Sequence, residues 1–169
     1  MNILRRMEEE VNPDGMCVTF DRKEPTFRHL AYADYKAQRK GMPEELAVQM
    51  PVLKEVLDAM NIPCYELAGW EADDLIGTIS RRCEAAGWDT PAATGTRTPC
   101  SWSRTIPTWN WLPPAWERPP PRRWTPARFR AAYGFAPVQM VDLKALMGDS
   151  STTSPGFRGW GENRPDPAP

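Results

Sequence analysis

Residues 69–78 read GWEADDLIGT and place three carboxylates, Glu71, Asp73 and Asp74, within four positions at the start of a predicted helix. Four residues at i, i+4, i+7 and i+11 predict a narrow stripe that packs on a sheet: Ala72, Ile76, Ile79 and Cys83. Residues 62–67, just upstream, are typical of a short strand. The acids therefore lie where a strand ends and a helix begins, which is the edge at which α/β sheets bind ligands.

These acids have two interpretations. Acids in the first turn of a helix complement the helix dipole by about a few tenths of a kcal/mol each, with no further role. Alternatively, the crowded carboxylates form a metal site, because a hard cation such as Mg²⁺ or Mn²⁺ relieves their repulsion. A β-branched and aromatic run at residues 18–20 ends in a further acid, Asp21, and favours the metal site.

The first ninety residues predict a parallel α/β sheet with an inserted basic helical segment. The expected elements are a helix over residues 1–10, a strand over 16–20, the basic segment 22–40, a helix over 43–60, a strand over 62–67 and a helix over 70–87. A core-packing stripe is expected on the fourth of these, made of Leu46, Met50, Leu53, Leu57 and Met60. Gly87 is expected to end the last helix.

The basic segment 22–40 interleaves cations with aromatic rings. If it is helical, one side carries Arg28, Tyr32, Lys36 and Arg39. Such a side suits phosphates, with rings available for stacking on bases. The alternative is an ordinary solvated face of an amphipathic helix.

Length and composition narrow the classes of protein. A chain of 169 residues is long enough for one domain with a proper core, and its net charge of -1 is uninformative as a total. Its four cysteines show no CxxC spacing and His29 is the single histidine, which argues against zinc sites and Cys/His nucleophiles. We find no apolar run of signal-peptide or membrane-span length and expect a reduced, cytoplasmic protein with no membrane partner.

The pattern changes after residue 90, where most of the 19 prolines and 8 tryptophans fall. We predict no helix or strand over residues 91–124 and expect this stretch to be disordered; a proline-rich, partner-binding module is the alternative. Helix signals return over residues 125–151. They predict one helix between Thr125 and Gly134 and another from Pro137. Residues 152–169 form a second aberrant stretch.

Six motifs together resemble the 5′-3′ exonuclease domain of bacterial DNA polymerase I, which is akin to the flap endonucleases. They are FDRK at 20–23, PTFRH at 25–29, YKAQR at 35–39, MPEEL at 42–46, GWEADDLIGT at 69–78 and LKALMGDSS at 143–151. The resemblance covers roughly residues 3–90 and 125–151. It implies a PIN-like α/β fold in which residues 22–40 form a helical arch.

The resemblance also implies an activity, namely cutting of phosphodiesters near the 5′ ends, flaps or nicks of DNA in replication and repair. Two divalent ions, Mg²⁺ or Mn²⁺, would serve this chemistry. The implied catalytic and metal-binding acids are Asp21, Glu71 and Asp73 around the first metal, with Asp74 as a neighbouring acid of the same cluster. Asp149 matches an acid near the second metal. The implied DNA-binding positions are Lys23, Arg28, Tyr35, Lys36 and Arg39. A polymerase domain in the full-length gene product would be a further partner.

The sequence departs from the family at three places. It lacks the family's leading strand with an aspartate, and threonines at 96 and 98 replace two acids of the Thr-Gly-Asp-x-Asp pattern. The family's DNA clamp is lost after Ser151. We therefore expect the first and third strands to be missing or degraded and the second metal site to be depleted. Our hypothesis is that both aberrant stretches are read out of frame and that Met1 is an internal methionine; the alternative function is a catalytically impaired DNA-binding fragment.

Overall fold

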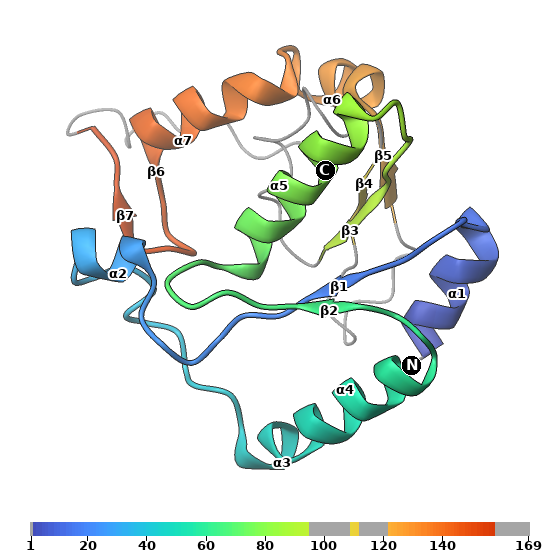
Figure 1. The fold of residues 1–169 in the computed structure, drawn as a ribbon. Helices are drawn as coiled ribbons and strands as arrows, with labels where there is room; N and C mark the ends of the chain where they lie inside the picture. Colours follow the sequence, from blue (N-terminus) through green and yellow to red (C-terminus); the bar gives the residue numbers. More distant parts are fainter. Residues whose placement is uncertain (1, 95–108, 112–121, 158–169) are drawn as a thin grey trace.

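The computed structural model describes residues 2–94, 109–111 and 122–157 (Figure 1). Its helices are α1 (Asn2–Val11), α2 (Phe27–Ala31), α3 (Glu44–Ala47), α4 (Gln49–Ala59), α5 (Ala72–Ala85), α6 (Pro126–Tyr133), the 3-10 helix η2 (Pro137–Gln139) and α7 (Met140–Met147). Its strands are β1 (Val18–Thr19), β2 (Cys64–Tyr65), β3 (Ala92–Thr94), β4 (Trp109–Trp111), β5 (Arg122–Trp124), β6 (Gly148–Asp149) and β7 (Ser154–Pro155). Within these ranges, no helix has both the length and the apolar character needed to span a membrane.

The strands β1 and β2 form the parallel pair that organises the site. Val18 faces Cys64 and Thr19 faces Tyr65 in the ladder, and Phe20 continues it by donating its N–H to the carbonyl of Tyr65 at 2.9 Å. Parallel strands place their carboxyl ends at one edge, so Asp21 and the chain that leads from β2 into α5 emerge together. This pairing confirms the predicted parallel α/β arrangement.

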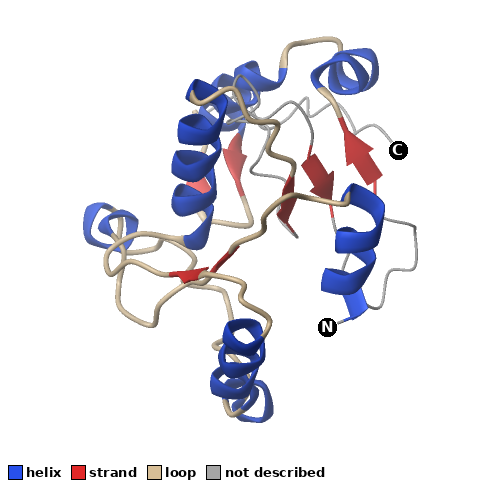
Figure 2. Cartoon of the chain, turned by 45° about the vertical axis from the view of Figure 1, so that its right-hand side comes forward, coloured by secondary structure: helices blue, strands red, loops and turns tan. Residues whose placement is uncertain are grey.

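A second sheet forms in the stretch where the sequence predicts no strand. β3 pairs with β4 in parallel and β4 pairs with β5 antiparallel, separately from β1 and β2 (Figure 2). The prediction for residues 91–124 is thus corrected for nine residues; apart from Pro91, which is in no strand, the rest of that stretch lies outside the described ranges. The third strand is likewise present at Ala92–Thr94, although β4 is its neighbour. Strands of three residues are too short to show a period in the sequence.

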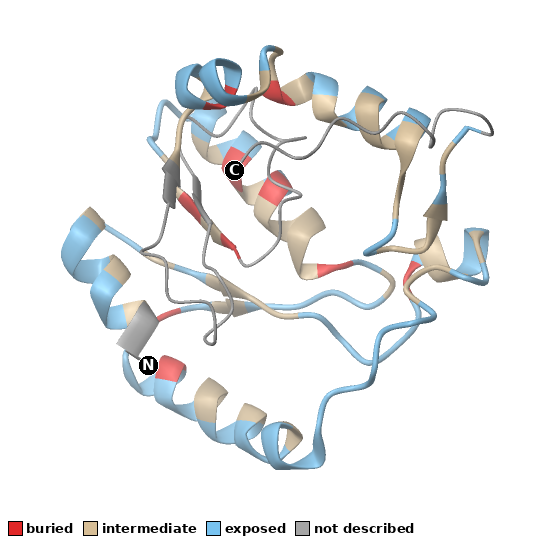
Figure 3. Ribbon diagram, turned by 180° about the vertical axis from the view of Figure 1, so that it is seen from behind, coloured by how far each residue is buried: buried red, intermediate tan, exposed pale blue. Residues whose placement is uncertain are grey.

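α5 begins and ends at the predicted signals. Glu71 is its N-cap residue, and Gly87 follows its end with a φ of 80°. The buried positions, red in Figure 3, include Gly77 and Ser80, whereas the predicted stripe residues are only half-buried. Of the predicted stripe, Ile76 packs against the buried residues Ala92 and Phe129. Ser80 satisfies its hydroxyl by donating to the carbonyl of Ile76 at 2.7 Å.

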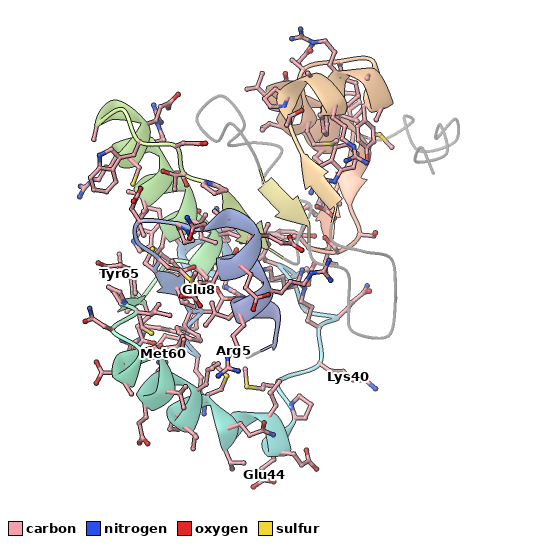
Figure 4. The ribbon with its side chains drawn as sticks, turned by 90° about the vertical axis from the view of Figure 1, so that its right-hand side faces the viewer. Arg5, Glu8, Lys40, Glu44, Met60 and Tyr65 are labelled. Atoms are coloured by element: carbon pink, nitrogen blue, oxygen red, sulfur yellow. The ribbon has the colours of Figure 1, made fainter. Side chains whose placement is uncertain are left out.

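Only five residues of the basic segment 22–40 are helical. α2 ends at Tyr32, whose φ of -146° and ψ of 107° are extended, and Lys36 adopts a positive φ of 55°. The prediction of one helical face over this segment is therefore wrong. Figure 4 shows Lys40 on the connecting chain that leads to Glu44 at the start of α3. The segment is instead an irregular loop with one short helix: Arg28 lies on α2, and Lys36 lies in the turns that follow it.

The predicted helix over residues 43–60 is divided into α3 and α4 at Val48. Pro51 explains the division, because proline has no N–H to donate to the carbonyl of Ala47 one turn earlier. The predicted core stripe is confirmed at Leu57, which is 1% exposed, but Leu46 at 46% and Met60 at 36% are surface residues.

The C-terminal part of the described chain has its own small core. Phe129 of α6 is 1% exposed and packs with buried Ala92 of β3, and half-buried rings and aliphatic side chains surround them: Ile76, Trp124, Tyr133, Phe135 and Met140. Thr125 caps α6 by accepting the N–H of Arg128 at 3.1 Å, and Gly134 ends it with a φ of 79°, as predicted. This core connects α5 to the C-terminal helices that precede Asp149, which lies on β6.

Candidate functional site

Three segments far apart in the sequence meet at the start of α5. Phe27 of α2 donates its N–H to the carbonyl of Gly69 at 3.0 Å, just before α5. Further along the basic segment, Lys36 donates its N–H to the carbonyl of Thr152 at 3.0 Å, in the turn between β6 and β7. Figure 1 shows α2 beside β7, near the first turn of α5. The backbone thereby holds residues 27–39 between the two groups of predicted acids.

Asp74 binds Arg28 through both carboxylate oxygens. The two terminal nitrogens of Arg28 donate to Oδ1 and Oδ2 at 2.7 Å each, and the carboxylate also accepts the N–H of Glu71 at 3.1 Å. The hydrogen bonds from Arg28 hold the pKa of Asp74 below its ordinary value, and the pairing raises the pKa of Arg28. Asp74 is therefore a charged, fully partnered side chain in the first turn of α5.

Glu71 is the most enclosed carboxylate of the site, with a side chain that is 11% exposed. It accepts a hydrogen bond from the Lys36 ammonium at 2.6 Å and another from the Tyr35 hydroxyl at 3.0 Å. Burial, followed by the charge of Glu71, raises the pKa of Tyr35, so the phenol stays protonated and donates. Arg28 lies 3.6 Å from the same carboxylate. Two cations and one phenol thus surround Glu71.

The other two predicted acids of this group, Asp21 and Asp73, lie at the N-terminal end of α5. Asp21, which follows β1, accepts the N–H of Ala72 through Oδ1 at 2.7 Å and so caps the first turn of the helix. Asp73 occupies that first turn and is half-buried. The prediction that Asp21 joins the acids of α5 therefore matches the geometry. Lys23, on the loop after β1, is exposed.

Asp149, on β6, forms a second group. It accepts hydrogen bonds from Lys144 at 2.8 Å and from the hydroxyl of Ser151 at 2.6 Å. Partial burial pushes the pKa of Asp149 upward, but the bonds from Lys144 and Ser151 together bring it below its ordinary value. Arg39 connects this group to the basic segment by donating Nε to the carbonyl of Ser151 at 3.1 Å.

The predicted metal ligands do not fit a divalent cation in this arrangement. Carboxylate oxygen is the right donor chemistry for Mg²⁺ or Mn²⁺. However, among the residues that the structure describes, no group of three or more Asp, Glu, His or Cys side chains is placed to hold a metal ion. Oxygens of Glu71, Asp74 and Asp21 instead accept hydrogen bonds from the protein itself. Thr96 and Thr98 lie outside the described ranges.

Sequence reasoning missed the pairing of the two charged groups. It assigned the acids to metal ions and the cations of residues 22–40 to DNA, whereas the structure joins them directly. It also missed the contact between the rings of Phe27 and Trp70, whose centroids are 5.0 Å apart and which tie α2 to the loop before α5. The sequence did contain a signal for this pairing. The basic segment 22–40 directly follows the strand that ends in Asp21, at the predicted sheet edge where the acids of residues 71–74 also lie.

Comparison with known proteins gives consistent results. The family model of the 5′-3′ exonuclease, N-terminal resolvase-like domain, matches residues 1–98. The chain is 40% identical over 160 residues to DNA polymerase I of Bacillus caldotenax and 38% identical over 162 residues to that of Bacillus subtilis (strain 168). In both cases the matched region covers 95% of this chain and 18% of the relative, so the chain spans less than a fifth of the length of these relatives.

Solved structures show the same fold. A T5 protein co-crystallised with metal ions superposes with a TM-score of 0.67 at 18% identity, covering 95% of this chain and 62% of that one. A mutant of the T5 5′-exonuclease gives a TM-score of 0.65 at 16% identity, with coverages of 95% and 59%. These neighbours have the PIN-like nuclease fold, which confirms the predicted fold class.

Proposed function

Because this chain belongs to the 5′-3′ exonuclease family, as its N-terminal resolvase-like domain, we propose that it handles the 5′ ends of DNA within a bacterial DNA polymerase I. The family's reaction is phosphodiester hydrolysis, and 5′ ends, flaps and nicks are the proposed substrates. Because the chain spans 18% of its relatives, an attached polymerase domain is part of the proposal, as is a cytoplasmic setting.

The observation that carries this proposal is the position of the basic segment against the start of α5. Arg28 and Lys36 bring guanidinium and ammonium groups to the edge of the sheet where β1 and β2 end. Arg39 adds a third cation on the same segment, next to the turn that follows β6. Cations in this arrangement suit the closely spaced phosphates of a DNA strand.

Each side chain has a role in this proposal that follows from its chemistry. Arg28 can hold a phosphate through two parallel hydrogen bonds, as it holds Asp74, whereas Lys36 acts as a point charge. Tyr35, protonated because of its raised pKa, can donate to a phosphate oxygen. A divalent cation, Mg²⁺ or Mn²⁺, would supply water activation and charge stabilisation in such hydrolysis. The described acids do not hold one as they stand, so no step is assigned to it.

The test is cleavage of a labelled 5′-flap DNA by the full chain in the presence of Mg²⁺ or Mn²⁺. We expect shortened products that require the cation and that disappear in Asp73→Asn. Asp89→Asn is the matched control, because Asp89 is an exposed acid beyond the other end of α5. Cleavage that persists unchanged in Asp73→Asn would remove the acids of α5 from the proposal.

A second candidate function is DNA binding without cleavage. The pairing of Glu71 and Asp74 with the chain's own cations favours it. Among the described residues, no group of three or more acids, histidines or cysteines is placed to hold a metal ion. In this case the flap DNA binds with an affinity that falls steeply with salt, and no product forms with either cation. The cleavage assay and a binding titration on the same DNA separate the two candidates.

A further inference from the structure

Two aromatic rings lie on the surface beside the candidate site. Phe27 of α2 is 44% exposed, and Trp70, in the loop before α5, is 47% exposed. Their ring centroids are 5.0 Å apart, with an angle of 55° between the ring planes. Two exposed leucines extend this surface: Leu30 follows Phe27 by three residues on α2, and the carbonyl of Leu67 accepts the N–H of Trp70 at 3.3 Å. These four residues form the aromatic patch.

The backbone holds the two rings of the aromatic patch in place. Phe27 donates its N–H to the carbonyl of Gly69 at 3.0 Å, directly before Trp70 in the chain. Gly69 has a φ of 81°, a conformation that favours glycine and that turns the chain toward α5. Thr26, the N-cap residue of α2, is buried, and its hydroxyl lies 2.8 Å from Nδ1 of His29. The rings are therefore positioned before any ligand arrives, which lowers the entropy cost of binding one.

Positive charge adjoins the aromatic patch. The guanidinium of Arg28 lies over the ring of Phe27, 4.4 Å from its centroid, while it also binds Asp74. Lys23 is exposed on the loop before α2. Residues 22–40 together contain six lysines and arginines against two acids. This excess of cations favours a polyanion over the apolar surface of a protein domain as the ligand of the patch.

An unpaired nucleobase is the part of such a polyanion that suits the rings. Every base has a flat π face that stacks on an aromatic side chain with little regard to sequence, while its phosphates meet the neighbouring cations. In a duplex each base is covered on both faces by the bases next to it. Only a single-stranded segment can therefore offer a face to the patch.

We infer that Phe27 and Trp70 form a stacking platform for an unpaired base of single-stranded DNA. Trp70 is the main stacking surface, because its ring is the larger and Arg28 covers one face of Phe27. Neither ring belongs to the DNA-binding positions that the sequence implies. This inference deepens the proposed function and rests on it: the platform selects single-stranded DNA over duplex at the edge where β1 and β2 end. Purines, with their larger rings, bind more tightly than pyrimidines.

The experiment measures binding of the full 169-residue chain to two labelled oligomers by fluorescence anisotropy, without divalent cations so that neither oligomer is cut. One is an oligodeoxyadenylate; the other has the same length and the same phosphates but carries abasic deoxyribose throughout. Because their charges are equal, the phosphate contribution cancels in the comparison. We expect the oligodeoxyadenylate to bind about 5- to 150-fold more tightly, the effect of stacking one base. Equal affinity for the two oligomers overturns the inference.

Variants test whether the patch is the place of stacking. Trp70→Leu keeps an apolar side chain against Phe27 but removes the flat ring. It should lower the affinity for the oligodeoxyadenylate by about 5- to 150-fold and leave the affinity for the abasic oligomer unchanged. Trp70→Phe should keep the base-dependent binding. Trp88→Leu is the control, because Trp88 is an exposed tryptophan beyond the other end of α5.

A loss of affinity that is the same for both oligomers in Trp70→Leu would assign Trp70 a structural role and contradict the inference. Base-dependent binding that persists in Trp70→Leu contradicts it as well, since the base then stacks elsewhere. If Trp70→Leu fails to fold by circular dichroism, Phe27→Leu replaces it, with a smaller loss expected on the oligodeoxyadenylate alone.

The outcomes also distinguish this inference from the proposed function. A chain that cleaves flap DNA but binds the two oligomers equally keeps the proposed function and loses the stacking platform. A chain whose base-dependent binding requires Trp70, but which cleaves no DNA, keeps the platform at a DNA-binding site that does not cut.

Discussion

Arg28 and Asp74, 46 positions apart in the chain, form a two-fold hydrogen-bonded ion pair in which both contacts measure 2.7 Å. The pair joins α2 to the first turn of α5 and so fixes the basic segment beside the acids. It lies next to Glu71, whose partners come from the same segment. The arrangement of the site and the stability of this part of the fold therefore depend on the same contacts.

Replacing Asp74 with asparagine should lower the free energy of unfolding by about 1–3 kcal/mol, because charge-assisted hydrogen bonds to Arg28 are lost in a partly enclosed place. Urea unfolding at pH 7 measures the change. Glu66→Gln is the control, since Glu66 forms a surface pair with Lys54 and its loss should leave the unfolding midpoint unchanged. Equal behaviour of the two variants would show that the pair contributes no stability.

The same pair predicts a pH dependence with a definite sign. The pKa of Asp74 is lower in the folded chain than in the unfolded chain, where it is about 3.9. Its contribution is therefore complete above that value and is lost as the pH falls through the lower, folded pKa. The difference in unfolding free energy between the parent chain and Asp74→Asn should shrink on going from pH 6 to pH 3. Asp149 titrates in both proteins and cancels in the difference, so a constant difference would contradict the assignment.

Gly148 should not tolerate a side chain. Its φ is 75°, and a Cβ atom there would lie 2.5 Å from the backbone nitrogen of Gly156. Gly148→Ala should destabilise the chain by more than about 1 kcal/mol, the scale of incompatible glycine replacements. Gly41→Ala is the control, because nothing lies within 4 Å of a Cβ at that position. Thermal unfolding of both variants checks the prediction, which fails if their midpoints agree.

Leu57 is the position on α4 where truncation should be costly. It is 1% exposed, whereas Val52 on the same helix is 57% exposed. Leu57→Ala should lower the free energy of unfolding by about 2–5 kcal/mol, as expected for a cavity in a core. Val52→Ala should change it by less than about 0.5 kcal/mol. Denaturant titrations compare them, and similar losses would mean that α4 does not pack as described.

Much of the fold could be predicted because local signals coincide with the elements. The ends of two helices could be predicted closely. Thr125 and Pro126 mark the start of α6 and Gly134 its end, and acids mark the start of α5 and Gly87 its end. Other features depend on contacts that a local pattern does not contain. The basic segment has helical spacing, but its hydrogen bond to Gly69 comes from the first residue of the short helix α2 and its bond to Thr152 comes from a turn at Lys36. The strands from β3 to β5 are held by their pairing with one another, and each is too short to show a pattern.

The candidate site was predicted as a set of residues and not as a set of contacts. Asp21, Glu71, Asp73 and Asp74 gather at the start of α5 as expected from the strand and helix order. Their interaction with Arg28 and Lys36 could not be predicted, because motif matching assigns each residue a ligand and does not consider the charges that lie opposite it in the folded chain. The assignment of these residues to metal binding and catalysis stays a prediction.

The reading frame is a separate prediction that DNA sequencing addresses. If the coding sequence through codons 88–125 and beyond codon 150, read in a shifted frame, restores the Thr-Gly-Asp-x-Asp pattern and the DNA clamp, the aberrant stretches are out of frame. A coding sequence that confirms the peptide in one frame, with no such acids in the alternatives, would end that hypothesis. The second metal site would then be absent from the gene product itself.

The central claim is that the basic segment binds DNA, and Arg39 tests it most directly because it is exposed and its hydrogen bond is to the carbonyl of Ser151. The measurement is the affinity for a 5′-flap DNA as a function of salt, in the parent chain and in Arg39→Gln, with Arg6→Gln on α1 as the control. We predict salt-dependent binding whose log–log slope is smaller by about 1 in Arg39→Gln and unchanged in Arg6→Gln. Binding that does not depend on salt, or a slope that is the same in all three proteins, would contradict the account.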